Sequence, residues 1–240
     1  MKIALTQYQP KAGYLAYNSE QHRHWIHQAQ KAGADLVVFS ELSLTGYEPD
    51  LAASLAVELT DEYWQSWQQL SDELAISFAM GMPVRMNEGI VIGLVLFQPQ
   101  QPHRIYAKQY LHVDEEPFFV PGTVWDGFWA ERQLAFAICY EISVPAHAEQ
   151  AIRNQAQLYL ASVAKFEHGI APSFERLAHL ARTHGIQTMM VNAVGPADNG
   201  LCVGQTAVWD RNGRLIAQLD TVEEACLLLD THTGAVTVLR

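Results

Sequence analysis

Leu134-Ala-Phe-Ala-Ile-Cys-Tyr-Glu141 is the most informative segment of this 240-residue sequence. Its first five residues are apolar without interruption, as in strands that are covered on both faces of a sheet. A cysteine closes the predicted strand over 134–139, and two polar residues follow it. Pro145 then stands in the favoured first turn of a predicted helix over 145–155. A buried strand that ends on polar residues and leads into a helix indicates sheets flanked by helices.

Apolar runs on both sides of this segment predict further strands. They cover residues 2–7, 35–39, 90–97, 157–163, 188–193, 206–209, 215–219 and 225–229. Helices are predicted over 19–32, opened by Asn18 and closed by Gly33, over 61–78, and over 172–184, closed by Gly185. Asp210-Arg-Asn-Gly213 carries the Asn-Gly signature of a tight reversal between two strands. No linker or repeat divides the sequence, so we expect one domain over 1–240.

The composition indicates a globular chain. Hydrophobic residues make up 49% of the sequence and charged residues 17%, which is less than the roughly one-quarter charged residues of typical globular chains. Such a chain can bury a large core, which argues against disorder. Fifteen basic and 26 acidic residues give a formal charge of −11, and no basic run interrupts the acidic balance. We therefore expect no nucleic-acid partner.

Three cysteines, Cys139, Cys202 and Cys226, lie far apart in the sequence, and such a sparse, odd set fits a reducing compartment. The first residues turn polar too early for the apolar core of a signal peptide. The longest apolar runs are too short to span a bilayer. We therefore expect a cytoplasmic protein with no membrane partner.

Three polar residues, Glu41, Lys108 and Cys139, stand just after apolar runs. In sheets flanked by helices, catalytic groups gather at the ends of strands. Each residue also has a structural alternative, because Cys139 could be a buried small hydrophobe, Glu41 a loop carboxylate and Lys108 a surface ammonium. Their combination, together with the residues around each of them, favours a catalytic site.

These segments resemble the signatures of the nitrilase superfamily, the carbon–nitrogen hydrolases. Val37-Val-Phe-Ser-Glu-Leu-Ser-Leu-Thr-Gly-Tyr47 is similar to the first signature, in which Pro-Glu precedes a few apolar residues and Thr-Gly-Tyr. Tyr106-Ala-Lys-Gln-Tyr-Leu111 is similar to the second, and Ala137-Ile-Cys-Tyr-Glu141 to the nucleophile segment. Glu115 and Phe118-Phe-Val-Pro-Gly122 resemble the glutamate and the turn that lie between those two. The similarity continues into the last third of the chain, in the order of the family.

The resemblance implies an α+β (mixed α/β) fold, the four-layer α-β-β-α sandwich, in which two mixed sheets pack face to face with helices outside. It implies hydrolysis of a non-peptide carbon–nitrogen bond, and a small amide that releases ammonia, an ω-amide or a short aliphatic amide, is the expected substrate. No cofactor and no metal are implied. Members commonly form homodimers or larger homo-oligomers, so we expect at least a homodimer.

The resemblance also assigns roles to individual residues. Cys139 is the expected nucleophile, and Glu41 is the expected general base and acid. Lys108 and the backbone N–H of Tyr140 are expected to stabilise the oxyanion, and Lys108 to lower the pKa of the Cys139 thiol. Glu115 is expected to fix the lysine or to orient the substrate nitrogen.

Several positions depart from the family pattern. Ser143 stands where many members carry arginine, which disfavours a substrate whose carboxylate needs a cation at that point. Lys165 and Phe166 stand where an aromatic pocket residue often follows the strand. Glu141 replaces an aspartate, and Gly185 stands where a structural glutamate is common. These differences leave the expected catalytic set intact and bear on the substrate.

Alternative functions remain open. A nitrilase or an N-carbamoyl amide hydrolase would use the same three side chains with a different pocket. Leu44-Thr-Gly-Tyr-Glu-Pro-Asp-Leu51 also resembles the glutaminase domain of NAD synthetases, and we expect that role to need the synthetase domain as a separate subunit. A binding module that kept the fold and lost turnover is a further alternative, against which the intact Glu41, Lys108 and Cys139 argue.

Other titratable residues predict no second site. His22, His24 and His27 share one predicted helix, and without a third ligand they favour a solvated helix face over a zinc site. The remaining histidines offer no identifiable base for a Cys–His protease, and no Gly-rich phosphate loop follows a strand. Cys202, in a glycine-flanked loop, and Cys226, in an apolar run, are expected to be dispensable.

Overall fold

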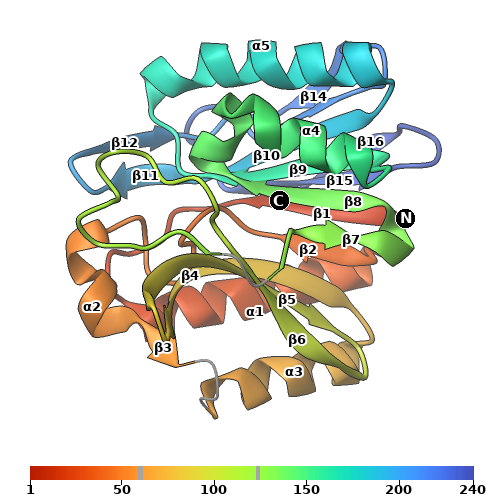
Figure 1. Cartoon of the computed structure of the whole chain (residues 1–240). Coiled ribbons are helices and arrows are strands. Elements are labelled where there is room, and N and C mark those ends of the chain that lie inside the picture. Colours follow the sequence, from red (N-terminus) through yellow and green to blue (C-terminus); the bar gives the residue numbers. More distant parts are fainter. Residues whose placement is uncertain (59–61, 123–124) are drawn as a thin grey trace.

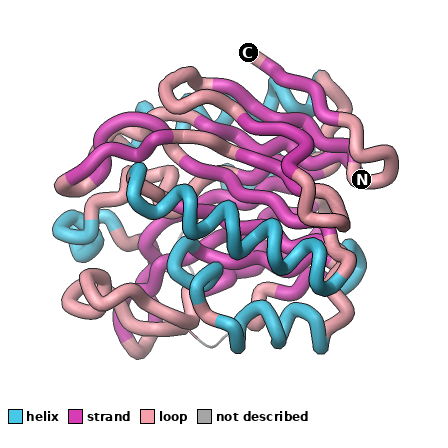
Figure 2. Tube along the Cα trace, turned by 90° about the horizontal axis from the view of Figure 1, so that it is seen from above, coloured by secondary structure: helices cyan, strands magenta, loops and turns pink. Residues whose placement is uncertain are grey.

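The protein folds as a four-layer α-β-β-α sandwich (Figure 1), which confirms the predicted fold class. The computed structural model describes residues 1–58, 62–122 and 125–240. Two mixed sheets pack face to face, and helices cover their outer faces. These helices are α1 (Leu15–Lys31) and α3 (Tyr63–Leu74) on the first sheet, and α4 (Pro145–Arg153) and α5 (Glu167–His184) on the second. Seen from above, helices lie over the strands of the sandwich (Figure 2).

The first sheet has eight strands in the spatial order β16-β15-β1-β2-β4-β5-β6, with β3 paired to β4. Strands β1, β2 and β4 run parallel to one another, whereas β15, β16, β5 and β6 are antiparallel to their neighbours. The strands are β1 (Lys2–Gln7), β2 (Leu36–Val38), β3 (Val57–Glu58), β4 (Ser77–Met86), β5 (Gly89–Gln98), β6 (Gln101–Ala107), β15 (Ala225–Asp230) and β16 (Val236–Leu239).

The second sheet has six strands in the order β14-β13-β10-β9-β8-β7, and its centre, β8-β9-β10, is parallel. Its strands are β7 (Phe128–Trp129), β8 (Leu134–Ile138), β9 (Leu158–Val163), β10 (Gln187–Asn192), β13 (Ala207–Trp209) and β14 (Leu215–Gln218). A separate two-stranded sheet pairs β11 (Val194–Ala197) with β12 (Gly200–Val203). The short helices are η1 (Pro49–Leu51), α2 (Ala52–Leu55), η2 (Ala130–Arg132) and η3 (Cys139–Ser143).

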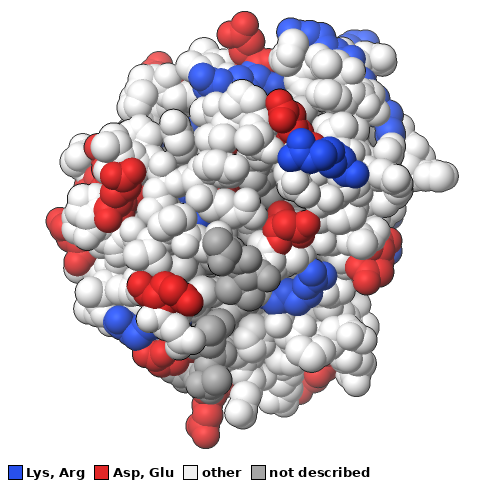
Figure 3. Space-filling view, in the orientation of Figure 1, with Lys and Arg blue, Asp and Glu red and all other residues white. Residues whose placement is uncertain are grey.

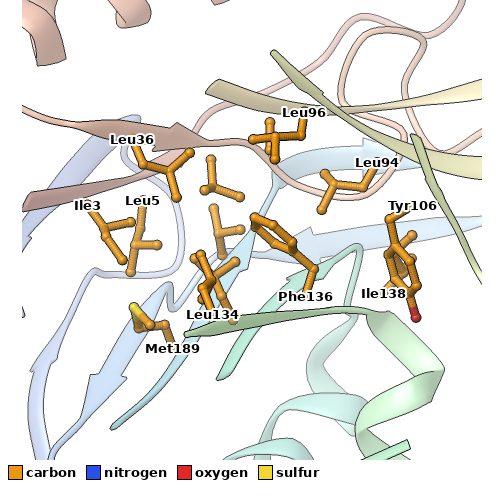
Figure 4. Close-up of a cluster of buried hydrophobic side chains, with 14 of the residues drawn as sticks. Ile3, Leu5, Leu36, Leu94, Leu96, Tyr106, Leu134, Phe136, Ile138 and Met189 are labelled. Atoms are coloured by element: carbon orange, nitrogen blue, oxygen red, sulfur yellow. The ribbon is translucent and has the colours of Figure 1, made fainter. Parts of the chain in front are cut away.

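Alternate side chains of the central strands pack on opposite faces of each sheet. In β2, Leu36 and Val38 point into the core between the sheets, whereas Val37 packs in the layer of α1 and α3. In β8, Phe136 enters the inter-sheet core (Figure 4), and Ala137 packs in the layer of α4 and α5. Both faces of these strands are therefore covered, which explains their uninterrupted apolar sequences.

The predicted strands are present, and their bounds differ from the prediction by at most one residue at either end. The prediction missed the strands β3, β4, β6, β7, β11, β12 and β16. The helix predicted over 61–78 ends at Leu74, and Phe78 lies in β4. Phe78 continues the four-residue spacing of Leu70 and Leu74, so the sequence pattern did not mark the end of the helix. Asp61, the predicted first residue of that helix, lies outside the described residues.

The predicted starts of two other helices are also corrected. α1 begins at Leu15, so Asn18 lies inside the helix rather than at its N-cap. The buried Asn18 side chain accepts from the N–H of Lys11 at 2.8 Å and donates to the carbonyl of Leu44 at 2.9 Å. It therefore ties α1 to the loop that follows β2. α5 begins at Glu167 instead of residue 172, and it ends before Gly185 as predicted.

Surface charges of both signs are interspersed on the face shown in Figure 3.

Asp210 and Gly213 form the predicted reversal between β13 and β14, in which the N–H of Gly213 donates to the carbonyl of Asp210 at 2.9 Å. Across residues 1–58, 62–122 and 125–240, no helix combines the length and apolar content needed to cross a bilayer.

Candidate active site

Glu41, Lys108 and Cys139 stand beyond the ends of strands from both sheets. Glu41 lies three residues after β2, Lys108 directly follows β6, and Cys139 directly follows β8. The sheets are joined beside this point, because the hydroxyl of Ser162 in β9 donates to the carbonyl of Phe39 at 2.9 Å. The sandwich therefore gathers at one edge three residues that are far apart in the sequence.

Lys108 binds two carboxylates in the interior. Its Nζ lies 2.7 Å from Oε1 of Glu41 and 2.6 Å from Oε1 of Glu115, and all three side chains are at most 1% exposed. The Tyr47 hydroxyl donates to Oε1 of Glu115 at 3.0 Å, and the N–H of His112 donates to Oε2 at 2.8 Å. Glu115 thus contacts the lysine directly, and Tyr47 is a site residue that sequence reasoning named only as part of a signature.

The protonation of the pair follows from burial and charge. Burial raises the pKa of Glu41 above its ordinary range, and the ammonium of Lys108 offsets this rise only in part. Burial acts to lower the pKa of Lys108, but the charges of Glu41, Cys139 and Glu115 outweigh it and raise that pKa. Lys108 is therefore an ammonium at neutral pH. Oε2 of Glu41 is buried and has no partner of ordinary hydrogen-bond geometry within the described residues. The Cys139 thiol lies near Glu41 and, as a weak donor, acts to lower the pKa of this carboxyl group.

Cys139 begins η3 in an unusual backbone conformation. Its φ is 42°, in the left-handed region, which costs a residue with a Cβ roughly 1–2 kcal/mol. The residue is partly exposed, and its Sγ lies 4.0 Å from the carbonyl oxygen of Ala164. A sharp turn directly after a buried strand thus presents the sulfur at the end of the sheet instead of in the core.

The thiol of Cys139 is protonated at rest. Burial of the sulfur raises its pKa to about 11, the carboxylate of Glu41 adds to the rise, and the cations Lys165 and Lys108 offset it only partly. Lys108 acts to lower this pKa, as expected, but burial and the charge of Glu41 outweigh it, so the thiol does not become a thiolate at neutral pH. A neutral thiol needs a base to become a nucleophile, and the carboxyl group of Glu41 lies next to it.

Tyr140 is the second residue of η3, and its side chain is exposed. The backbone N–H groups in the first turn of a helix have no acceptor within the helix. The position is therefore compatible with the expected oxyanion donor, and that role stays a prediction. The Tyr140 ring meets the His112 ring edge-on, with centroids 5.3 Å apart.

Glu141 is a central residue of the site that the sequence did not identify as such. Its Oε1 accepts the N–H of Gln109 at 2.6 Å, and its Oε2 accepts the N–H of Ile138 at 2.7 Å and the hydroxyl of Tyr106 at 2.6 Å. The Tyr106 hydroxyl also lies 2.8 Å from Nε2 of His147. This fully buried carboxylate joins the cysteine turn to the residues on both sides of Lys108.

A pocket of about 530 Å³ opens beside the thiol. Its lining includes Tyr47, Glu115, Cys139, Tyr140, Lys165 and Phe166. The departures at positions 165 and 166 therefore lie in the pocket wall. Ser143 instead lines a different cavity, beside α4 and α5, so this departure does not lie in the wall of the pocket beside the thiol.

His22 and Cys202 have surroundings that differ from those expected. His22 is fully buried rather than solvated, and its Nε2 lies 2.9 Å from the hydroxyl of Ser43, whereas His24 and His27 are exposed. Cys202 lies buried in β12 and not in a loop. Within the described part of the chain, no group of three or more His, Cys, Asp or Glu side chains is arranged to hold a metal ion.

Comparisons with known proteins bear on this fold. The carbon-nitrogen hydrolase family model matches residues 2–238. The chain is similar to solved structures of an amidase of the nitrilase superfamily from Nesterenkonia sp. AN1. One of them is 26% identical with a TM-score of 0.82, over 96% of this chain and 90% of that chain. A complex of the same amidase with butyramide is 24% identical with a TM-score of 0.83, over the same shares.

The curated relatives that the chain matches are glutamine-dependent NAD(+) synthetases. The glutamine-dependent NAD(+) synthetase of Acinetobacter baylyi is 24% identical over 238 residues, which cover 93% of this chain and 42% of that protein. The enzyme of the same name from Rhodobacter capsulatus is 26% identical over 255 residues, which cover 98% of this chain and 44% of that protein. The chain thus spans less than half the length of the curated relatives it matches.

Proposed function

Because the chain belongs to the carbon–nitrogen hydrolase family, we propose that it hydrolyses a small linear amide and releases ammonia. Cys139 is the proposed nucleophile, Glu41 the general base and acid, and Lys108 the oxyanion donor, supported by Glu115 and by the N–H of Tyr140. The reaction proceeds through a thioester on the cysteine and needs no cofactor.

The buried cluster of Lys108 with Glu41 and Glu115, next to a thiol that lines a pocket, is the observation that carries the proposal. Burying one ammonium and two carboxylates costs stability, and hydrophobic residues in their place are often neutral or stabilising. A module that only binds ligands has no evident need for such a cluster beside a cysteine. An enzyme that moves protons to and from a sulfur atom does need it.

In the first half of the reaction, Sγ of Cys139 attacks the carbonyl carbon while Oε2 of Glu41 accepts the thiol proton. The tetrahedral intermediate carries a negative oxygen, which the ammonium of Lys108 and the N–H of Tyr140 stabilise. The carbon–nitrogen bond then breaks, and Glu41 returns the proton to the nitrogen, which leaves as ammonia. The acyl group remains on the sulfur as a thioester.

In the second half, a water molecule enters the place that ammonia has left. Glu41 accepts one of its protons, and the oxygen attacks the thioester carbonyl. The carbon–sulfur bond breaks, the sulfur regains its proton from Glu41, and the carboxylic acid leaves. Lys108 stabilises this second oxyanion too, so we expect Lys108→Met to lower kcat at least about 10²–10³-fold, the usual effect of losing one oxyanion donor.

Ammonia release from a panel of substrates tests the proposal. The panel contains butyramide and other short amides, the matching nitriles and N-carbamoyl compounds, so that it also separates the alternatives within the family. Cys139→Ala and Cys139→Ser should release no ammonia from any of them while their circular dichroism matches that of the wild type. Cys202→Ala serves as the control and should remain active. Full activity in either Cys139 variant would end the proposal.

Glutamine is a second candidate substrate. It is favoured by the curated relatives, which are glutamine-dependent NAD(+) synthetases. In that case the chain supplies ammonia to a synthetase domain. Hydrolysis of glutamine at a higher kcat/KM than butyramide supports this candidate, and the reverse order favours a stand-alone amidase.

We also propose that residues 1–240 form one domain, that the protein is cytoplasmic and that it assembles at least as a homodimer. The shared core between the two sheets supports the first of these proposals. Light scattering of the purified chain measures the assembly directly.

A further inference from the structure

Lys165 is a second lysine beside the proposed nucleophile, and it has no role in the proposed reaction steps. It follows β9 by two residues and precedes α5, and its side chain lines the same pocket as Cys139. Its neighbour Ala164 provides the carbonyl oxygen that lies 4.0 Å from the sulfur. Lys165 is therefore built into the wall next to the reacting atom.

The backbone of Lys165 is held firmly in place. Its N–H donates to Oδ1 of Asn192 at 2.8 Å, and its carbonyl accepts from Nδ2 of the same side chain at 3.1 Å. Asn192 is fully buried at the end of β10, and it also donates to the carbonyl of Gly204 at 2.8 Å. The two hydrogen bonds between the buried Asn192 amide and the backbone of Lys165 therefore fix where the lysine side chain starts.

Within the described residues, the charge of Lys165 has no protein partner, in contrast to that of Lys108. Lys108 contacts two carboxylates, whereas none of the ion pairs in the described residues includes Lys165. The field of Lys165 nevertheless reaches the thiol, because it acts to lower the pKa of Cys139. A partly buried cation without a counter-ion, facing a pocket, is suited to bind an anion that enters that pocket.

Other charges in the pocket are compatible with an anionic ligand. Glu115 is already bound to Lys108, so its charge is compensated. Asp50, Asp114 and Asp198 also line the pocket, but all three are exposed. Water and salt screen such exposed charges, and Lys165 is less exposed than they are.

We propose that Lys165 determines substrate specificity by binding the carboxylate of a linear amide that carries an acid group at its far end. The inference rests on the proposed amidase function and names the substrate class for the same site. The substrate is thus the monoamide of a dicarboxylic acid, or an amino acid with a side-chain amide.

Two substrates of equal length test this assignment. Glutaramate carries a carboxylate where pentanamide carries a methyl group. In the wild type we expect a higher kcat/KM for glutaramate, and in Lys165→Met we expect the glutaramate-to-pentanamide ratio to fall about 10- to 100-fold, mainly through KM, because a charge-assisted hydrogen bond is lost. Lys165→Arg keeps the charge and should restore most of the ratio. Lys31→Met, an exposed lysine on α1, makes the same change in net charge and should leave the ratio unchanged.

The ratio separates substrate binding from a general effect on the thiol. If Lys165 acted only through the pKa of Cys139, Lys165→Met would change both substrates by the same factor and the ratio would stay constant. A constant ratio, or a wild type that prefers pentanamide, overturns the assignment.

A binding assay keeps this inference distinct from the proposed function. Iodoacetamide labels Cys139 at pH 9, and peptide mass spectrometry follows the rate. Glutaramate should protect the wild-type thiol at lower concentration than pentanamide, and this difference should disappear in Lys165→Met. A wild type that hydrolyses no amide defeats the proposed function, yet the protection assay still tests Lys165. Equal protection by both compounds in the wild type defeats the inference about Lys165 alone.

Discussion

Glu141 accepts the backbone N–H of Gln109 at 2.6 Å, and this contact joins the turn that begins at Cys139 to the residue after Lys108. The same carboxylate accepts the N–H of Ile138, the residue before Cys139. One buried side chain therefore fixes the backbone beside the proposed nucleophile relative to the backbone beside the proposed oxyanion donor. These two segments come from different sheets, so the contact sets a distance that neither sheet sets alone.

We predict that Glu141→Gln is less stable than the wild type and has a lower kcat. The amide group turns one acceptor into a donor that faces the N–H groups of Gln109 or Ile138, and each buried unsatisfied donor costs about 1–3 kcal/mol. We expect the free energy of unfolding to fall by roughly 2–4 kcal/mol and kcat to fall more than tenfold. Urea unfolding and ammonia release measure the two effects. Glu149→Gln, on the exposed surface of α4, is the control, and a Glu141→Gln protein that matches it in both assays contradicts the prediction.

Alkylation of Cys139 should report a thiol with a high pKa. Because the pKa is about 11, the rate with iodoacetamide should rise about tenfold per pH unit from pH 7 to pH 10 without a plateau, since only the thiolate reacts. Glu41→Gln removes a negative charge near the sulfur, so it should move the midpoint of this profile to lower pH. A plateau below pH 9 in the wild type, or an upward shift in Glu41→Gln, is the opposite result.

The acidic limb of the pH–rate profile should reflect Glu41. A general base must be deprotonated, and burial raises the pKa of this carboxyl group. We therefore expect kcat/KM for a neutral amide such as butyramide to fall as the pH decreases, with a midpoint above about 4.3, the value for a free glutamate. Initial rates between pH 4 and pH 8, in buffers of constant ionic strength, give this midpoint. A midpoint at or below that of free glutamate speaks against Glu41 as the base.

The left-handed conformation of Cys139 leads to a prediction about stability. With φ at 42°, any residue with a Cβ is strained, whereas glycine is not. Cys139→Gly should therefore be more stable than Cys139→Ala by up to about 1 kcal/mol, although glycine loses more backbone entropy on folding. Urea unfolding of the two inactive variants measures the difference. A Cys139→Ala protein that is clearly the more stable one shows that the turn is not strained.

Sequence reasoning was most reliable where one pattern determined one structure. The uninterrupted apolar run before Cys139 predicted a strand that is covered on both faces, and β8 is such a strand. The same reasoning failed where two patterns overlapped, since Phe78 continues the helical spacing of Leu70 and Leu74 but lies in β4. Local periodicity cannot locate that boundary, because the choice depends on the pairing of β4 with β2 and β5.

The residues expected at the site came together, but their electrostatics did not follow from the sequence. Lys108 was recognised as a cation that lowers the pKa of Cys139, yet burial of the sulfur and the charge of Glu41 raise this pKa by more. Glu141 could not be identified as a link, because its partners Gln109 and Tyr106 lie 32 and 35 positions away. Such contacts depend on how the two sheets pack, which no local motif records.

His22 should make the protein less stable as the pH falls. Burial lowers its pKa to about 3, because a charged imidazole would lose its hydration in the layer between α1 and the first sheet, whereas in the unfolded chain it titrates near 6.5. The neutral ring holds the loop after Glu41, because Nε2 of His22 contacts the hydroxyl of Ser43. Protonation of the ring would change this contact. Below pH 6.5 the unfolded chain binds a proton that the folded protein does not, so stability is complete above this pH and is lost between about 6.5 and 3.

The expected size of this effect is about 1.4 kcal/mol per pH unit for each such histidine. Buried His147, whose pKa is lowered to about 4, should contribute in the same way. Urea unfolding at pH 6.5 and pH 5 should show the wild type losing about 3 kcal/mol and His22→Gln about half of that, whereas His24→Gln, on the exposed side of α1, should behave as the wild type does. Equal pH dependence of stability in the wild type and in His22→Gln would show that His22 is protonated in the folded protein.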